Sequence, residues 1–358
     1  ASRLRGRRML NLDSEEEGVF TAGCAGGVRA NCSIPVKREK YGDGLVSYEV
    51  TVGGLLGGHS GCDIDKERAS SNRLTGRFLH EASKRMPLRV ISMSGGEYDN
   101  VIPGKTVSTV AVSDIDRSAF EKLAREYDAI YKKELQSCDP GVFLNANPTK
   151  NSDDPLTVCD TEKILTALRI LPYGIQNMSM DIKGLVQTSL NMGVLRLENE
   201  SFNYSYAIRS SVATQKKELL DRVETVTKLL GGSVATHGEY PGWEYARESA
   251  LRDKVLEAYR IVYGGVGVVS ATHGGLECGL FADKIPGLDC VSYGPELHDV
   301  HSVRERLGIA SVDEVSIDAT GRLHYLRRHN GDQSHQGRHV RIACGEWKIL
   351  HVKLYEYK

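Results

Sequence analysis

The chain has 358 residues, of which 40% are hydrophobic and 26% are charged. This composition is ordinary for a globular protein, and the length predicts about two domains, each with a sizeable core. A formal net charge of −1 argues against the large basic surface that a nucleic-acid partner needs. Apolar runs stay well short of the roughly 20 residues that span a bilayer, so we expect no membrane partner.

The eight cysteines are scattered along the chain without a CxxC pair. Such spacing favours buried thiols over disulfides and predicts a protein of the reducing cytoplasm. The first residues, ASRLRGRRML, lack the apolar stretch of a signal peptide. Residues 311–358 are rich in arginine and histidine with little periodicity, and this tail stays unassigned.

The first half of the chain predicts alternating strands and helices. Residues 9–18, MLNLDSEEEG, form a strand-like run that ends in acids. Apolar alternation predicts further strands at 45–52, 88–96 and 106–112. We expect a helix that Asp65 caps and Pro87 stops, and an amphipathic helix over 118–137.

A second, similar unit follows from residue 156. It contains an expected helix at 161–171, strands at 186–198 and 204–212, and a helix at 217–232. After Gly232, a helix over 247–264 lies among short apolar runs, at 266–271 and 288–294, that are typical of buried α/β strands. We therefore predict an α/β domain, residues 27–228, inserted between two pieces of another α/β domain, residues 1–26 and 229–310.

One histidine lies in a glycine-rich stretch where a strand gives way to a helix. His59 is part of GGLLGGHSGC, residues 53–62. The stretch lacks the glycine spacing of a G-x-S-x-G nucleophile elbow and the Gly-Lys-Ser/Thr of a P-loop. Glycines permit positive φ angles, so a flexible elbow that presents His59 to a ligand is one interpretation. The alternative is a turn histidine that faces water.

Acidic and histidine side chains at strand ends are candidate metal ligands. Asp13 follows an apolar strand, and His298 and His301 follow the run LDCVSYG. One carboxylate and one histidine are fewer than the three or four ligands that zinc usually takes, and an acidic run is more often a solvated face.

Three further positions are candidates for substrate contacts. Arg209 lies inside an apolar strand, where its planar fork suits a carboxylate or, equally, an internal ion pair. Asn100 in EYDNVIPG caps a turn or binds a ligand. Gly275 in THGGLECG lies between a strand and a helix, where backbone N–H groups can hold an anion.

Taken together, several motifs resemble the aminoacylhistidine dipeptidases in order from Met9 to Ala310. They are NLDSEEEG, CAGG, GGHSGCDIDKERASSNRL, NVIPG, AIRSSV, EYPGW, THGGLECGLF, IPGLDCVSYGP and DVHSVRERL. The resemblance implies a cytosolic hydrolase of Xaa-His dipeptides with two zinc ions per site. It also implies an α/β catalytic domain interrupted by a lid domain that carries a homodimer interface.

The resemblance also implies roles for individual residues. Asp13 would be a carboxylate ligand of one zinc ion and His301 a ligand of the other. His59 would belong to the lid and polarise the scissile carbonyl in the active site of the partner subunit. Asn100 and Arg209 would hold the substrate, with Arg209 aimed at its C-terminal carboxylate.

By the same resemblance, Gly275 would offer the substrate a backbone contact. The family's histidine-x-aspartate segment, bridging aspartate and glutamate pair all precede NLDSEEEG, and no H-x-D occurs in this chain. We therefore expect an N-terminally truncated dipeptidase with an incomplete ligand set, inactive by itself. The alternatives are a non-catalytic dimerising lid module and a related two-zinc hydrolase of tripeptides or acylated amino acids.

Overall fold

The computed structural model describes residues 6–151, 153–300 and 303–308, together with Ser311 and the residue pairs 316–317 and 323–324. The chain divides into two compact units. Unit 1 comprises residues 1–26, 179–185 and 240–358, and unit 2 comprises residues 27–178 and 186–239. Unit 2 thus extends to Glu239, beyond the boundary that the sequence predicted at residue 228.

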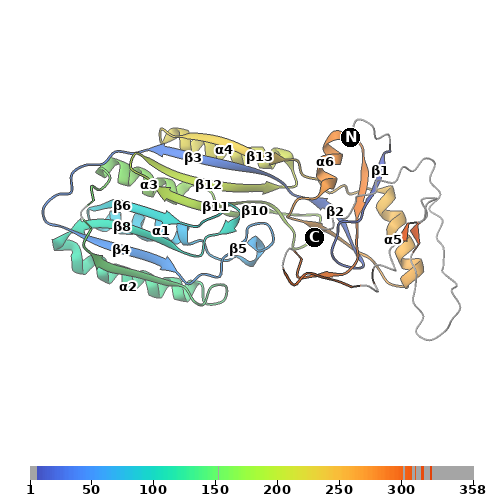
Figure 1. Cartoon of the computed structure of the whole chain (residues 1–358), viewed down its shortest axis with the longest axis horizontal. Helices are drawn as coiled ribbons and strands as arrows, with labels where there is room; N and C mark the ends of the chain where they lie inside the picture. The colour runs from blue at the N-terminus through green and yellow to red at the C-terminus, as the bar shows by residue number, and fades with distance from the viewer. Residues whose placement is uncertain are drawn as a thin grey trace. The chain divides into compact units, whose positions relative to one another are not determined.

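Unit 2 is built on a nine-stranded sheet (Figure 1). Its strands are β3 (Gly26–Pro35), β4 (Leu45–Gly53), β6 (Leu88–Gly95), β8 (Thr106–Ser113), β9 (Phe143–Thr149), β10 (Gly174–Met178), β11 (Val186–Leu197), β12 (Ser201–Ser210) and β13 (Ser233–Tyr240). The strand order is β13-β3-β12-β11-β6-β8-β4-β9, and β10 pairs with β11 beside this path. The helices are α1 (Ser71–Arg85), α2 (Arg117–Glu134), α3 (Val158–Ile170) and α4 (Ala213–Leu229).

The sheet consists of two halves with the same topology. The first half is β4-α1-β6-β8-α2-β9, and the second is β3-α3-β11-β12-α4-β13. If the four strands of each half are numbered along the chain, both halves have the spatial order 2-3-1-4 from the middle of the sheet to its edge. This order is β6-β8-β4-β9 in the first half and β11-β12-β3-β13 in the second. The halves meet through the antiparallel pair β6 and β11, where Leu195 faces Gly95, and through helices α1 and α3. The second similar unit expected from the sequence is therefore a structural repeat, with the first half inserted into the second.

The two halves share one apolar core. Tyr48 of β4 packs against Phe120 of α2 with ring centroids 5.0 Å apart, and Phe120 lies 5.6 Å from Phe78 of α1. Leu165 of α3 and Val223 of α4 are fully buried in the same cluster. Because all four helices contribute to one cluster, they cover the same face of the sheet, and burial of each large apolar side chain contributes roughly 1.5–3 kcal/mol.

Several predicted boundaries were wrong. Asp65 does not cap a helix, because residues Ile64–Lys66 form one 3-10 turn that Glu67 ends with a φ of +51°. Helix α1 begins only at Ser71. Four strands of this sheet, β3, β9, β10 and β13, were not predicted from the sequence. The glycine pair that opens β3 and the exposure of most of β13 explain why apolar alternation missed them.

Unit 1 contains a four-stranded sheet in the order β1-β15-β2-β14. The strands are β1 (Arg8–Asn11), β2 (Val19–Cys24), β14 (Val268–Thr272) and β15 (Asp289–Ser292), and the helices are α5 (Ala250–Tyr263) and α6 (Glu277–Lys284). Strands β1 and β15 are parallel, as are β2 and β14, whereas β15 and β2 are antiparallel. Phe20 of β2 packs edge-on against Tyr259 of α5, with ring centroids 5.3 Å apart. Both units thus combine helices with sheets, as the sequence predicted.

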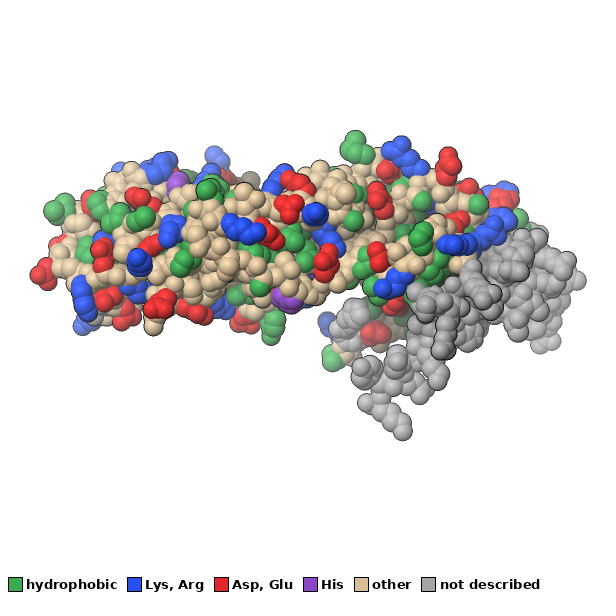
Figure 2. Space-filling view, turned by 90° about the horizontal axis from the view of Figure 1, so that it is seen from above, with side chains coloured by type: hydrophobic (Ala, Val, Ile, Leu, Met, Phe, Trp, Pro, Cys, Tyr) green, Lys and Arg blue, Asp and Glu red, His purple; other side chains and the backbone are tan. Residues whose placement is uncertain are grey.

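The surface carries charges of both signs. Figure 2 shows Lys and Arg side chains interspersed with Asp and Glu over the described part of the face in view, in keeping with a net charge of −1. No disulfide joins the cysteines that the structure describes. None of the described helices combines the length and the apolar character of a membrane-spanning segment.

Candidate functional site

The glycine-rich stretch between β4 and α1 folds back on itself and presents His59. Gly58 and His59 form the short strand β5, which pairs with β7 (Val101–Ile102). Gly57 has a φ of +63° and Gly58 a φ of +140°. At Gly58 a Cβ atom would lie 2.7 Å from Oδ2 of Asp63, so both the angle and the space require glycine.

Hydrogen bonds fix the orientation and the tautomer of His59. Its backbone N–H donates to Oδ2 of Asp63 over 2.8 Å. The backbone N–H groups of Gly61 and Cys62 both point at Nδ1 of the imidazole, each at 3.3 Å. Because Nδ1 accepts these bonds, the ring proton of the neutral imidazole lies on Nε2. His59 is therefore arranged as a donor through Nε2–H.

Arg209 approaches the same imidazole from the second half of the repeat. It lies next to the end of β12, opposite Ser189 of β11. A Cβ atom on Gly61 would lie 2.9 Å from Cε1 of His59 and 3.3 Å from Cζ of Arg209. Gly61 thus separates the two side chains with no room for a larger residue. The structure brings together two of the residues that the sequence singled out, each from a different half.

Burial lowers the pKa of His59 below its ordinary value of 6.5, and the positive charge of Arg209 lowers it further, while Asp63 opposes the shift. We expect His59 to titrate below pH 6.5, with the Nε2–H tautomer visible in long-range 1H–15N NMR spectra. Arg209→Gln should raise this pKa and Asp63→Asn should lower it further. Because the pKa of His59 is lower in the folded state than in the unfolded state, the unfolded state binds the proton first as the pH falls. The free energy of unfolding therefore decreases between about pH 6.5 and the lower, folded-state pKa. Unchanged titration in both variants would contradict this electrostatic account.

Asn100 lies beside the His59 loop through its backbone. Its carbonyl oxygen accepts a hydrogen bond of 2.8 Å from the N–H of Ser60. The chain around Asn100 is held by the buried amide of Asn191 on β11, which donates to the carbonyl oxygens of Asp99 at 2.8 Å and Val101 at 2.9 Å. Asn191 was not among the residues that the sequence singled out. It shows that the second half of the repeat supports the loops of the first.

A buried carboxylate closes the base of the glycine-rich loop. Asp139 is fully buried, and its two carboxylate oxygens accept backbone N–H groups from Leu56 and Ala69, each at 2.7 Å. These two residues flank the loop that carries His59. Asp139 was also missed from the sequence, because nothing in its neighbourhood, SCDPGV, distinguishes it from an ordinary turn residue.

The remaining candidates belong to unit 1. Asp13 follows β1 and is exposed, and Gly275 follows β14 with Tyr240 packed against it, 2.9 Å from where a Cβ would lie. Strands β1 and β14 run in opposite directions, so they end at opposite edges of the sheet. His301 lies outside the described residues, and His298 is exposed, 3.9 Å from Oε1 of Glu296. Within the described part of the chain, no group of three or more His, Cys, Asp or Glu side chains could hold a metal ion.

Comparisons with known proteins add a family relationship to this geometry. Residues 50–137 match the peptidase dimerisation domain (M20_dimer), and residues 295–341 match a domain of unknown function, DUF5597. The chain is 32% identical over 304 residues to the cytosol non-specific dipeptidase of Escherichia coli (strain K12). This alignment covers 85% of this chain and 63% of that protein. The crystal structure of aminoacylhistidine dipeptidase from Vibrio alginolyticus matches with a TM-score of 0.83 at 32% identity, over 87% of this chain and 64% of that one.

This chain is related to the aminoacylhistidine dipeptidases. The resemblance inferred from the motifs is confirmed, as is the α/β peptidase fold with a dimerisation domain. The chain spans less than two thirds of the length of each of these two dipeptidases. The match to the dimerisation domain covers most of the first half of the repeat, from β4 to α2, which includes His59 and Asn100. Arg209 comes from the second half, outside that match.

Proposed function

We propose that unit 2 of this chain is the substrate-holding lid of a dipeptidase that acts on Xaa-His dipeptides. The observation that carries the proposal is the pair formed by the His59 imidazole and the Arg209 guanidinium, which Gly61 separates. A dipeptide offers a carbonyl oxygen and a terminal carboxylate a few bonds apart. The neutral imidazole of His59 can donate to the carbonyl oxygen, and the guanidinium of Arg209 beside it can pair with the carboxylate.

The proposed contacts follow from the chemistry of each side chain. The guanidinium of Arg209 pairs with the C-terminal carboxylate through parallel N–H···O bonds. Nε2–H of His59 donates to the oxygen of the scissile carbonyl, where negative charge develops as the bond is attacked. Loss of one such donor costs about 2.7–4 kcal/mol of transition-state stabilisation in hydrolases. Asn100 lies on the adjoining loop and is the third proposed substrate contact.

The described residues do not form a site that fits the metal ions of a dipeptidase. Asp13 is a single exposed carboxylate, and no cluster that could hold a metal ion accompanies it in the described part of the chain. Zinc in proteins takes three or four nitrogen, sulfur or oxygen ligands. The proposal therefore assigns no step to a metal ion and rests on the substrate contacts of the lid.

His59 and Arg209 lie together within one chain. We therefore propose that one lid contributes both residues to the same bound dipeptide. The match to a peptidase dimerisation domain and the dipeptidase resemblance support a homodimer, and the name of the Escherichia coli relative supports a cytosolic location.

Dipeptide binding and hydrolysis by the purified chain, with zinc supplied, test this function. We expect saturable binding of an Xaa-His dipeptide without turnover, because the donor set described for this chain is incomplete. The His59→Ala variant should keep most of the binding, since Arg209 holds the carboxylate. Absence of binding would contradict the proposed lid, and zinc-dependent hydrolysis that His59→Ala abolishes would contradict the incomplete metal site.

A further inference from the structure

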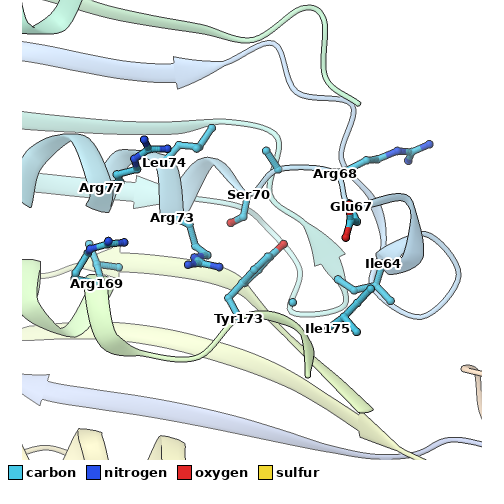
Figure 3. A pocket seen from close by; sticks show the side chains of 13 residues that line it. Ile64, Glu67, Arg68, Ser70, Arg73, Leu74, Arg77, Arg169, Tyr173 and Ile175 are labelled. Atoms are coloured by element: carbon cyan, nitrogen blue, oxygen red, sulfur yellow. The ribbon is translucent and has the colours of Figure 1, made fainter. Parts of the chain in front are cut away.

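A pocket of about 560 Å³ opens in unit 2 between the start of α1 and the end of α3 (Figure 3). It shares no residue with the cluster of His59, Asn100 and Arg209. Its lining is rich in cations and hydroxyl groups, namely Arg68, Arg73, Arg77, Arg169, Ser70 and Tyr173. One acid, Glu67, also lines it. The excess of positive charge distinguishes this pocket from the mixed surface around it.

Two buried hydroxyl groups, those of Ser70 and Tyr173, line the pocket side by side, and neither forms a hydrogen bond with any other residue that the structure describes. Ser70 is only 3% exposed, and its buried Oγ atom does not cap α1, although Ser70 occupies the N-cap position of that helix. The buried hydroxyl of Tyr173 lies beside that of Ser70 and bonds no other described residue. Burial raises the pKa of Tyr173 to about 12, with Ser70 and Arg73 opposing the shift, so this hydroxyl stays protonated as a donor. Each hydroxyl can donate one hydrogen bond and accept two, so a contact between the pair leaves hydrogen-bonding capacity that a ligand in the pocket can use.

Two of the four arginines are available to such a ligand. Arg77 is held by Glu134 through bonds of 2.6 and 3.0 Å, and Arg68 donates to the carbonyl oxygen of Gly57 at 2.6 Å. In contrast, no carboxylate of the described residues forms an ion pair with the exposed side chains of Arg73 or Arg169.

Arg73 lies over the ring of Tyr173, with its Cζ atom 5.3 Å from the ring centroid. Figure 3 shows Ser70 between the guanidinium of Arg73 and the hydroxyl end of Tyr173, whereas Arg68 points away. A cation and two hydroxyl groups thus line the pocket at the N-terminus of a 15-residue helix, where the helix dipole also favours negative charge.

We propose that this pocket binds the phosphate group of a small anionic molecule. Arg73 and Arg169 supply charge, and Ser70 and Tyr173 donate hydrogen bonds from other directions. Donors that approach from several sides suit a tetrahedral oxyanion better than a planar carboxylate, which one guanidinium fork satisfies. The volume lies in the range of small-molecule sites, so the pocket accommodates more than the phosphate itself.

Calorimetric titration of the whole chain with inorganic phosphate, at constant ionic strength in chloride, tests the site. We expect saturable binding by the wild-type chain and a loss of about tenfold or more in affinity for the double variant Arg73→Ala/Arg169→Ala. Ser70→Ala should weaken phosphate binding without lowering the midpoint of thermal unfolding, because its hydroxyl does not cap α1 and bonds no described residue except its pocket neighbour Tyr173. Lys84→Ala, on the same helix but outside the pocket, should bind phosphate like the wild type.

Several outcomes would overturn the assignment. Heats that do not saturate, or a double variant that binds phosphate as well as the wild type, would show that this pocket is not the site. Acetate that binds as tightly as phosphate would show a carboxylate site. An equal loss of affinity in Lys84→Ala would indicate a diffuse effect of positive charge.

Discussion

Replacement of Arg209 with glutamine is expected to weaken binding of an Xaa-His dipeptide by about 30-fold. The variant removes the cation that pairs with the C-terminal carboxylate, and a hydrogen bond to a charged group contributes about 1.5–3 kcal/mol. Arg209→Lys keeps the charge but loses the planar fork, so its affinity should fall between those of the wild type and Arg209→Gln. Isothermal titration of the three proteins with one dipeptide gives the comparison.

Arg222→Gln is a suitable control for the Arg209 variants. Arg222 is exposed on α4 in the same half of the repeat and forms an i,i+4 ion pair with Glu218. Its replacement should leave dipeptide affinity unchanged, because exposed ion pairs of this kind contribute little. If Arg209→Gln bound the dipeptide as tightly as Arg222→Gln, Arg209 would not be the carboxylate anchor.

Replacement of Asp139 with alanine should have the largest effect on stability, about 3 kcal/mol in the free energy of unfolding. The variant leaves the N–H groups of Leu56 and Ala69 without the buried carboxylate that accepts both of them. Each unsatisfied buried group costs about 1–3 kcal/mol. Chemical denaturation followed by circular dichroism measures the change.

The loop that carries His59 should loosen at the same time, which hydrogen exchange at Ser60 and Asp63 would detect. Asp43→Ala removes an exposed carboxylate and should change the free energy of unfolding by less than about 0.5 kcal/mol. An Asp139→Ala variant as stable as Asp43→Ala would show that the carboxylate does not hold the loop.

The repeat could be predicted from the sequence in outline because its strands alternate clearly. Tyr48, Val50 and Val52 of β4 are fully buried, as the alternation predicted. The insertion of one half into the other could not be predicted, since it depends on β3, whose glycine-rich start hides its alternation. The edge strand β13 was missed for a related reason, because most of its residues are exposed.

The candidate site was predictable where local sequence dictates geometry. The glycines around His59 indicated an unusual backbone, and the positive φ angles of Gly57 and Gly58 explain them. The proximity of His59 and Arg209 depends on long-range packing of the two halves. Sequence spacing alone therefore did not decide whether Arg209 binds a ligand or forms an internal ion pair. Asp139 could not be predicted for the same reason, because its partners lie 70 and 83 residues earlier in the chain.

The most direct test of the proposed lid is the NMR titration of His59 with and without a dipeptide. An Xaa-His dipeptide should shift the Nε2 resonance saturably and raise the pKa of His59, because its carboxylate offsets the positive charge of Arg209 that lowers this pKa. The same dipeptide with an amidated C-terminus should do neither. An unchanged His59, or an equal response to the amidated dipeptide, would contradict a lid in which Arg209 holds the carboxylate beside His59.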